Sequence, residues 1–408
     1  MITGEESWEL ALVRLLFVTN FFPYKSNPSR GIFVVRRLIE YKKLGVSYRV
    51  YGLAFRESPL LLALKRLLKK SPLVPLEDFQ GIEFEYVYTR RGLSEVLSHK
   101  RGNTTFVERW ARQVAGEILS SVGEDFDVIL AHGMYLPVPA GLVALHLHRM
   151  TGKDYFVFLH GSDVNYQMRH PRLLGTYLNV LENARRALFV SNALKEQATR
   201  LGYSGQNAAV VPNGYDPEIF HPIDKVEIRK KLGIFRDGWK YVGFVGNLKE
   251  VKGADRLPEI FRFILRELPN TLFIIVGDGT LRKRLEEQLG DVDVIFTGNI
   301  PQTDVALYMN AMDVMVLPSR NEGWPCVILE AQACGTTVVG SDKGGIPEAV
   351  GFPEYVVEDG PDFKKRFAQR VVKFLSEGYD GKMLIQRAKN FTWESIVKSE
   401  LELITNSR

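Results

Sequence analysis

Cysteine and long apolar runs are scarce in this sequence. Its 408 residues include only two cysteines, Cys326 and Cys334. On one helix they would stand about 12 Å apart, beyond the roughly 7 Å between Cα atoms that a disulfide spans. Two unpaired thiols predict a reducing, cytoplasmic location. No apolar run reaches the 18 residues of a membrane span, and the longest, 136–147, contains two prolines and a histidine and is predicted to form a buried helix.

Signals for secretion and for several kinds of chemistry are also missing. The N-terminus carries Glu5, Glu6 and Glu9, without the basic start or the small-residue cleavage site of a secretory signal. His-x3-His and paired Cys-x2-Cys spacings do not occur, so we expect no metal. A Gly-x-Ser-x-Gly turn and a Walker phosphate loop are lacking too, which argues against the hydrolases and nucleotide triphosphatases that use them.

The composition is that of a globular protein with an uneven charge. With 45% hydrophobic and 25% charged residues, the chain is not disordered, collagen-like or a coiled coil. A length of 408 residues predicts two domains of about 200 residues each. Residues 1–215 hold 27 Lys and Arg against 19 Asp and Glu, a net +8, whereas residues 216–408 hold 26 against 29, a net −3. Any function must account for a basic first half.

Short β-branched or aromatic runs alternate with amphipathic stretches along the chain. In the first half the predicted strands are 15–19, 48–53, 128–131, 155–159, 188–191 and 209–211, and the predicted helices include 32–44, 106–119 and 138–149. In the second half the predicted strands are 241–245, 272–276, 294–297, 314–317, 337–340 and 355–357, followed by a helical stretch over 363–407. This alternation predicts an α/β fold with two parallel, doubly wound sheets covered by helices. The turn formers of 212–222 predict the linker.

The segment Pro59–Pro75 departs from this pattern. It mixes leucines with Lys65, Arg66, Lys69 and Lys70. That composition is typical of a basic amphipathic helix that lies on an anionic membrane surface. The alternative is a helix whose leucines pack on the sheet while its cations face water. The sequence leaves both interpretations open.

The most specific signal follows the predicted strand 314–317. Glu322 lies in the loop after this strand, and Glu330 lies one turn into the next helix, which begins near Pro325. Ligands bind at this edge of an open α/β sheet, where a helix start attracts anions. The backbone N–H groups expected to face an anion are those of Trp324, Cys326 and Val327. The arrangement suits a ligand with hydroxyls next to phosphates, although the spacing alone would favour two solvated carboxylates.

Three further predicted strands end in glycine turns, at Gly246, Gly277 and Gly298. Glycine lets a flat ring or a phosphate approach the backbone. Lys252 opens the helix after the first of these turns, where an ammonium group suits a diphosphate, although a surface lysine is the alternative. All four turns are predicted at one sheet edge, which strengthens the case for a site.

The first half contributes a smaller set of candidates. His160 and Asp163 close a predicted strand in the run His-Gly-Ser-Asp. The imidazole could donate to a substrate hydroxyl or position it, and a structural role is the alternative. Gly31 begins a predicted helix, where it could contact a phosphate or an acceptor, and Arg36 follows one turn later.

These motifs, in this order, resemble glycosyltransferase family 4, the retaining nucleotide-sugar enzymes with the GT-B fold, over roughly residues 14–404. The resemblance rests on His-Gly-x-Asp at 160–163, Val-Pro-Asn-Gly-x-Asp…Phe-x-Pro at 211–222, the glycine and Lys-Gly stretch at 243–253, Gly-Asp-Gly at 277–279, Glu-x7-Glu at 322–330 and Gly-Gly-Ile-Pro-Glu at 344–348. Each motif is weak by itself, but their order and spacing together are specific.

The resemblance implies two Rossmann-like domains that face each other across a cleft. An acceptor-binding domain would comprise residues 1–215 with a C-terminal helix at about 385–408. A nucleotide-sugar-binding domain would comprise residues 216–384.

The resemblance also implies a role for each candidate residue. Lys252 would neutralise the leaving diphosphate, Glu322 would hold the hydroxyls of the donor sugar, and Glu330 would bind those of the ribose. His160 would lie by the reacting sugar, and Gly31 would approach the phosphates. The other residues expected in the site are, for the donor, Gly246, Asn247, Gly277, Gly298, Gly323, Trp324, Pro325, Cys326 and Val327, and, for the acceptor, Asp163 and Arg36.

The implied reaction moves a sugar from a UDP- or GDP-sugar to an acceptor hydroxyl, with retention and without a metal or other cofactor. The acceptor would attack from the front face while the leaving phosphate takes its proton, since no carboxylate stands out as a covalent nucleophile. An epimerase or sugar phosphorylase of the same fold is one alternative. A non-catalytic protein that binds membrane or nucleic acid is another, but the cations lack the interleaved aromatic residues of a base-stacking platform, so we expect no nucleic acid.

One departure from the family concerns the diphosphate. Many relatives carry arginine where this chain has Asn247. Either Lys249, Lys343 or a residue of the other domain compensates, or the affinity for the donor is lower, and the sequence does not choose among these.

The acceptor is expected to be a carbohydrate, lipid-linked or phosphorylated molecule, because the +8 charge belongs to the acceptor half. The enzyme is expected in the cytoplasm and, through residues 59–75, peripherally on the inner face of the membrane.

Overall fold

The computed structural model describes residues 13–28, 30–67, 74–93 and 104–406. The chain divides into two compact units, Met1–Pro212 with Val397–Arg408, and Asn213–Ile396. Some residues named above fall outside the described ranges: Glu5, Glu6, Glu9, Lys69 and Lys70.

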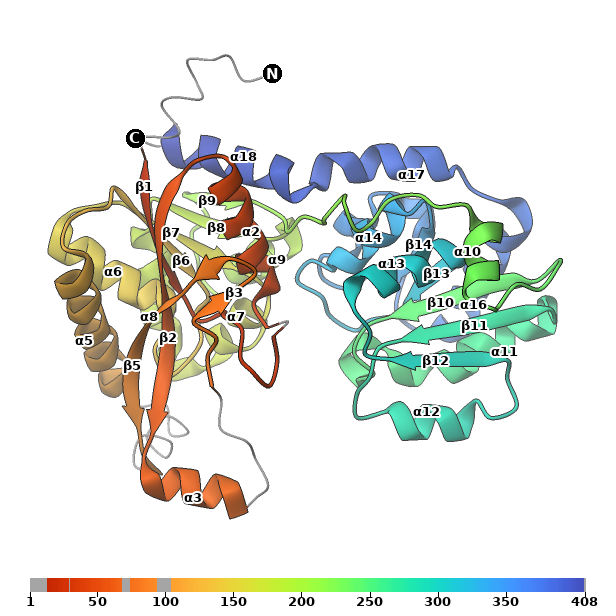
Figure 1. The fold of residues 1–408 in the computed structure, drawn as a ribbon, viewed down its shortest axis with the longest axis horizontal. Helices are drawn as coiled ribbons and strands as arrows, with labels where there is room; N and C mark the ends of the chain where they lie inside the picture. The colour runs from red at the N-terminus through yellow and green to blue at the C-terminus, as the bar shows by residue number, and fades with distance from the viewer. Residues whose placement is uncertain (1–12, 29, 68–73, 94–103, 407–408) are drawn as a thin grey trace. The chain divides into compact units, whose positions relative to one another are not determined.

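The first unit is built on a parallel sheet of seven strands in the order β5-β2-β1-β6-β7-β8-β9 (Figure 1). The strands are β1 (Arg14–Thr19), β2 (Ser47–Glu57), β5 (Glu85–Arg91), β6 (Val128–His132), β7 (Tyr155–Leu159), β8 (Arg186–Phe189) and β9 (Ala208–Val210). Its helices are α2 (Ile32–Lys43), α3 (Pro59–Leu67), α5 (Thr104–Val122), α6 (Ala140–Thr151), α7 (Ser162–Asn165), α8 (Pro171–Asn183) and α9 (Asn192–Arg200). A short hairpin joins β3 (Asp78–Phe79) to β4 (Ile82–Glu83).

The second unit is built on a parallel sheet of six strands in the order β12-β11-β10-β13-β14-β15. The strands are β10 (Lys240–Val245), β11 (Thr271–Val276), β12 (Val294–Gly298), β13 (Val314–Leu317), β14 (Thr337–Ser341) and β15 (Val356–Val357). The helices are α10 (Lys225–Lys231), α11 (Leu257–Glu267), α12 (Arg282–Gln288), α13 (Gln302–Ala311), α14 (Cys326–Ala333), α15 (Ile346–Val350), α16 (Phe363–Glu377), α17 (Gly381–Ala388) and α18 (Trp393–Thr405), the last of which continues into the first unit.

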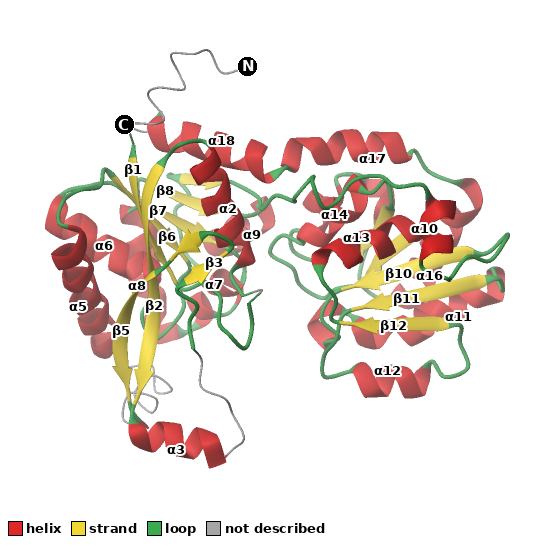
Figure 2. Cartoon of the chain, viewed as in Figure 1, coloured by secondary structure: helices red, strands yellow, loops and turns green. Residues whose placement is uncertain are grey.

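Hydrophobic patterning explains how the strands and the helices pack in each unit. The central strands are buried on both faces: all six residues of β11 are buried, as are all five of β7. A parallel sheet needs helices on each side to achieve this burial, and Figure 2 shows them against the sheet of each unit. In α11 the buried residues recur at helical spacing, at Leu257, Ile260, Phe261 and Ile264. The predicted fold class of two parallel, doubly wound sheets is therefore confirmed.

The strand order brings the predicted site turns to one edge. Since β12, β11, β10 and β13 are neighbours and every pairing is parallel, their carboxyl ends meet on the same side of the sheet. From β10 the chain adds β11 and β12 on one side, and it then returns to add β13, β14 and β15 on the other side. A crevice that can hold a ligand forms at such a switch point, here between β10 and β13.

The sequence prediction omitted β5. This strand lies at the edge of its sheet, and buried and exposed positions alternate along it. An edge strand with one wet face lacks the continuous apolar run that marked the others. Within the described ranges, no helix combines the length and the apolar character required to cross a bilayer.

A buried ion pair anchors the C-terminal helix within the first unit. Glu400 of α18 accepts from Arg37 Nε at 2.9 Å and from the Tyr41 hydroxyl at 2.5 Å. The side chains of Arg37 and Glu400 are 0% exposed. Burial, together with the charge of Glu400, raises the pKa of Tyr41 well above its usual range, so its hydroxyl remains a proton donor. This cluster attaches α18 to α2, although the paired residues are about 360 positions apart in the sequence.

Candidate active site

Glu322 and Lys252 form an ion pair at the carboxyl edge of the second sheet. Lys252 Nζ lies 2.7 Å from both carboxylate oxygens of Glu322, and Ser319 Oγ lies 3.0 Å from Oε1. The side chain of Glu322 is 9% exposed and that of Lys252 is 31% exposed. The two residues expected to bind the sugar and the diphosphate are therefore partners of each other, poised at a partly open surface.

The turn that carries Lys252 packs directly on the loop that carries Glu322. Lys252 ends a short 3-10 helix, and Gly253 follows with φ of +69°. A Cβ at Gly253 would stand 2.0 Å from the carbonyl oxygen of Pro318. Glycine is required here for its conformation and for this close approach, and it lets the ammonium group reach the carboxylate.

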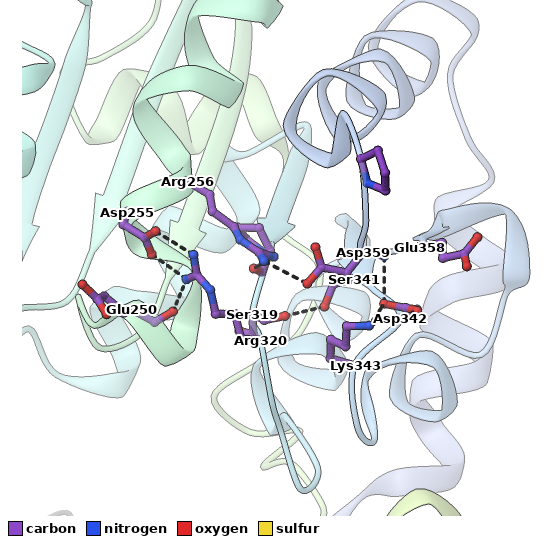
Figure 3. Close-up of polar contacts among 12 residues, drawn as sticks. Glu250, Asp255, Arg256, Ser319, Arg320, Ser341, Asp342, Lys343, Glu358 and Asp359 are labelled. Carbon is purple, nitrogen blue, oxygen red and sulfur yellow. Dashed lines mark hydrogen bonds and ion pairs between the residues drawn. The ribbon is translucent and has the colours of Figure 1, made fainter.

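Two arginines that the sequence reasoning missed brace the loop after β13 (Figure 3). Arg320 binds both carboxylate oxygens of Asp255 at 2.7 Å. Arg256 donates to the Pro318 carbonyl at 3.0 Å and to Asp359 at 2.8 Å. Burial alone would raise the pKa of Asp255, but hydrogen bonds and the charge of Arg320 lower it. The Asp255 carboxylate therefore stays ionised, and the hydrogen bonds of the two arginines tie down the loop that carries Glu322.

The end of β14 and the loop after it support the same segment from its other side. Ser341 Oγ donates to the Ser319 carbonyl at 2.6 Å, as Figure 3 shows, and the Gly345 N–H donates to the Glu322 carbonyl at 3.0 Å. Gly345 belongs to the Gly-Gly-Ile-Pro-Glu motif at 344–348. That motif thus positions the backbone of Glu322.

The three glycine turns stack on one another at the same edge. The Gly246 N–H donates to the Val276 carbonyl at 2.9 Å, and the Gly277 N–H donates to the Gly298 carbonyl at 2.9 Å. Asn247, next to the first turn, is exposed. These hydrogen bonds join the three turns in the order of their strands, and the next strand along the sheet is β13, which precedes the Glu322 loop.

Helix α14 begins directly after the Glu322 loop. Cys326 and Val327 are its first residues, with Gly323 and Pro325 just before them. The first N–H groups of a helix have no acceptor within the helix, so they favour an anion. Glu330, one turn further, is half-buried.

Trp324 fixes the entry to α14. Its side chain is buried, and Nε1 donates to the Asn213 carbonyl at 2.9 Å. Its ring also lies 5.7 Å from that of Phe391, centre to centre. The contact of Trp324 with a donor stays a prediction, and its observed role is to position the start of the helix.

In the first unit, the half-buried His160 pairs with the fully buried His132. His160 Nε2 lies 3.3 Å from Nδ1 of His132, which ends β6 and stacks on the ring of Phe158. Burial lowers the pKa of both histidines well below the usual range, so both rings are neutral. His160 Nδ1 and His132 Nε2 have no hydrogen-bond partner among the described residues. Sequence reasoning missed His132, whose signal was a histidine at a strand end.

Asp163 holds the loop of His160. It is fully buried, and its carboxylate accepts from the N–H groups of His160, Gly161 and Val164 at 2.8–3.2 Å. Burial raises its pKa, and the backbone hydrogen bonds oppose that rise. These hydrogen bonds fix the backbone of the loop and so orient His160. The predicted contact of Asp163 with an acceptor stays a prediction.

Gly31 and Arg36 lie at the start of α2. Gly31 has φ of +72°, and a Cβ there would stand 2.7 Å from the Phe21 carbonyl carbon, so no other residue fits without strain. Arg36 is half-exposed. Their contacts with donor and acceptor remain predictions.

Comparison with known proteins decides the family. The family model described as Glycosyl transferases group 1 matches residues 224–391, and the model described as Glycosyltransferase Family 4 matches residues 42–219. The chain belongs to glycosyltransferase family 4. It is therefore an enzyme, and the non-catalytic alternative is set aside.

Relatives and solved structures agree with this assignment. The chain is 28% identical, over 90% of its length and 90% of the relative's, to a protein of Bacillus subtilis (strain 168) named as a teichuronic acid biosynthesis glycosyltransferase, TuaC. It is 25% identical, over 66% of its length and 71% of the relative's, to N-acetyl-alpha-D-glucosaminyl L-malate synthase of Bacillus anthracis. The structure of Anabaena HepE in complex with UDP matches with a TM-score of 0.71 at 18% identity, over 97% of this chain and 100% of the other. The GT-B fold is thereby confirmed.

The resemblance predicts an arginine where this chain has Asn247, and the structure places the two lysines of the second unit that were expected to compensate for it. Lys343 pairs with Asp342 at 3.2 Å. Lys249 is exposed and makes no side-chain hydrogen bond or ion pair with any part of the chain that the structure describes. Of the two lysines, Lys249 therefore has the fewer side-chain contacts among the described residues.

The described residues also bear on metal binding. Among them, no three His, Cys, Asp or Glu side chains gather in a group that could hold a metal ion.

Proposed function

We propose that this glycosyltransferase moves a sugar from a uridine or guanosine diphosphate sugar to an acceptor hydroxyl, with retention at the anomeric carbon and without a metal. The observation that carries the proposal is the Lys252–Glu322 pair beside the stacked glycine turns and the start of α14. A cation for a diphosphate and a carboxylate for sugar hydroxyls then stand side by side.

The chemistry needs positive charge where the phosphate leaves. As the bond between sugar and phosphate breaks, negative charge grows on the phosphate oxygens and positive charge grows at the anomeric carbon. An ammonium group has three donors, so Lys252 can keep Glu322 while it binds a phosphate oxygen. Together with the N–H groups at the start of α14, it stabilises the leaving group without reorganisation. We propose that these groups take the place of a metal.

The state of Glu322 supports a binding role. Its carboxylate accepts from Lys252 and Ser319, which makes it a poor nucleophile and a well-oriented acceptor for sugar hydroxyls. We therefore propose front-face attack, in which the leaving phosphate takes the acceptor proton. The neutral His160, whose Nδ1 has no partner among the described residues, is proposed to contact the reacting sugar.

We propose that the acceptor is an anionic molecule of the carbohydrate, lipid-linked or phosphorylated kind, bound mainly by the first unit. The net +8 of residues 1–215 supports this, as do the names of two relatives, which refer to teichuronic acid and to L-malate. A cytoplasmic location is also proposed, since no disulfide joins Cys326 and Cys334.

A panel of nucleotides is expected to identify the donor. One nucleoside diphosphate, at about 100 times its dissociation constant, should stabilise the protein by about 2.7 kcal/mol, which raises the thermal transition by several degrees. UDP, GDP and ADP are compared by differential scanning fluorimetry. The matched monophosphate is the control, because it lacks the phosphate that Lys252 is proposed to bind. If no diphosphate raises the transition above the monophosphate, the donor proposal fails.

The stereochemistry and metal dependence are tested with the donor so identified. An α-linked donor should give an α-linked product, read from the anomeric proton coupling by NMR, and excess EDTA should leave the rate unchanged. A β-linked product would overturn retention, and loss of activity in EDTA would overturn metal independence. Conversion of the donor sugar in the absence of acceptor would instead identify an epimerase.

A further inference from the structure

Helix α3 presents its apolar face to solvent. Leu60, Leu64 and Leu67 are 64%, 41% and 81% exposed, and Ala63 is exposed too. Their spacing of three and four residues places these four side chains on one face, here called the leucine stripe. Only Leu61 of α3 is buried.

The opposite face of α3 holds a cation. Lys65 is 22% exposed and pairs with Glu57, the last residue of β2. An ordinary surface helix buries its apolar face and exposes its charges. Three of the five leucines of α3 instead face solvent, so the interpretation in which the leucines pack on the sheet does not hold for Leu60, Leu64 and Leu67.

Exposed apolar side chains concentrate in this region. Among the described residues, eleven large hydrophobic side chains are exposed, and five of them lie within residues 60–93. No other described helix or strand carries more than one. Single exposed apolar residues are normal, but a contiguous group marks an interaction site.

Arginines lie at the strand ends next to α3 and on α3 itself. Arg56 and Arg90 face each other in the register of β2 and β5, and both are exposed. Arg91 follows Arg90, and its carbonyl accepts from the Ser58 N–H at 2.9 Å just before α3 begins. Arg66 of α3 is exposed beside the stripe. Figure 1 shows α3 beyond the ends of β2 and β5, and Arg56, Arg90 and Arg91 are among the last residues of these two strands.

We propose that the leucine stripe and these arginines dock the enzyme on a membrane that contains anionic lipids. Aliphatic side chains of this kind enter the boundary between head groups and acyl chains, while neighbouring cations bind anionic head groups. A protein partner fits less well, because the stripe lacks the aromatic anchors of protein interfaces. A nine-residue helix, about 14 Å long, also offers far less than the roughly 800 Å² that a stable partner covers.

The proposal extends the proposed function, because a lipid-linked acceptor would lie in the same membrane. The idea that the acceptor is lipid-linked rests on the proposed function. Docking itself needs neither donor nor acceptor, so it is measured separately.

The test is co-sedimentation of the full chain with vesicles of phosphatidylcholine alone or with about 30% phosphatidylglycerol. Binding to the anionic vesicles should be at least about tenfold stronger than to the neutral ones, and about 0.5 M NaCl should weaken it. The variant Leu60→Ser/Leu64→Ser/Leu67→Ser should lose at least about tenfold in binding. Arg56→Gln/Arg90→Gln should lose the preference for anionic lipid.

The control variant Val226→Ser/Met383→Ser changes two exposed apolar residues of the second unit and should bind as the unchanged protein does. The nucleotide-induced thermal shift should persist in the leucine variant, which separates docking from donor binding. Equal binding to both vesicle types, or full binding by the leucine variant, would overturn the proposal. A dimer in light scattering that the leucine variant converts to a monomer would also overturn it, because the occupant would be a second copy.

Discussion

Replacing Lys252 or Glu322 with alanine is expected to lower sugar transfer at least about 10²-fold in each case, as the loss of one preorganised electrostatic contact does. Lys252→Ala removes the cation that we propose meets the leaving phosphate. Glu322→Ala removes the carboxylate that we propose binds the sugar hydroxyls, and whose oxygens lie 2.7 Å from the Lys252 ammonium nitrogen. The rate of nucleoside diphosphate release with saturating acceptor measures both losses.

Three further variants make this prediction specific. Lys231→Ala removes an exposed lysine of α10 and should keep full activity. Glu322→Gln retains a hydrogen-bonding group without its charge and should fall between the alanine variant and the unchanged protein. The double variant Lys252→Ala/Glu322→Ala should lose less than the product of the two single losses, because residues that act as a unit are not additive. Full activity in either single alanine variant would contradict the assigned roles.

Glu400→Ala is expected to destabilise the first unit by about 3–5 kcal/mol, the usual cost of removing one partner from a buried ion pair. The substitution leaves the guanidinium group of Arg37 uncompensated at 0% exposure, and it removes the acceptor of the Tyr41 hydroxyl. Urea unfolding followed by circular dichroism measures the free energy.

The matched control is Glu402→Ala, on the same helix but exposed, which should change stability by no more than about 0.5 kcal/mol. Glu400→Gln should cost less than Glu400→Ala, since the amide oxygen still accepts a hydrogen bond. If Glu400→Ala is as stable as Glu402→Ala, the pair does not anchor α18.

Much of the fold follows from local pattern. Buried parallel strands such as β7 and β11 are continuous apolar runs, so the pattern predicts their positions closely. The four site turns follow strands, and parallel pairing necessarily collects the ends of neighbouring strands at one edge. The position of Glu322 and Lys252 at that edge was predictable for this reason.

Contacts between distant segments were not predictable from pattern. Arg36 and Arg37 are neighbours in the sequence, yet on a helix they point about 100° apart, and only packing shows that Arg37 faces inward to meet Glu400. Likewise, Arg256 and Arg320 look like ordinary surface cations, and their partners Asp359 and Asp255 are 103 and 65 positions away.

The sequence by itself determined the α/β class, the family and the residue types at the carboxyl edge of the second sheet, because these depend on short-range periodicity and on motif spacing. The tertiary structure alone decided three matters. It paired Lys252 with Glu322, it joined His160 to His132, and it turned three leucines of α3 outward. The physical reason is shared: an amphipathic pattern or a motif specifies which side chains differ in polarity, but only the packed neighbours specify which of them meet.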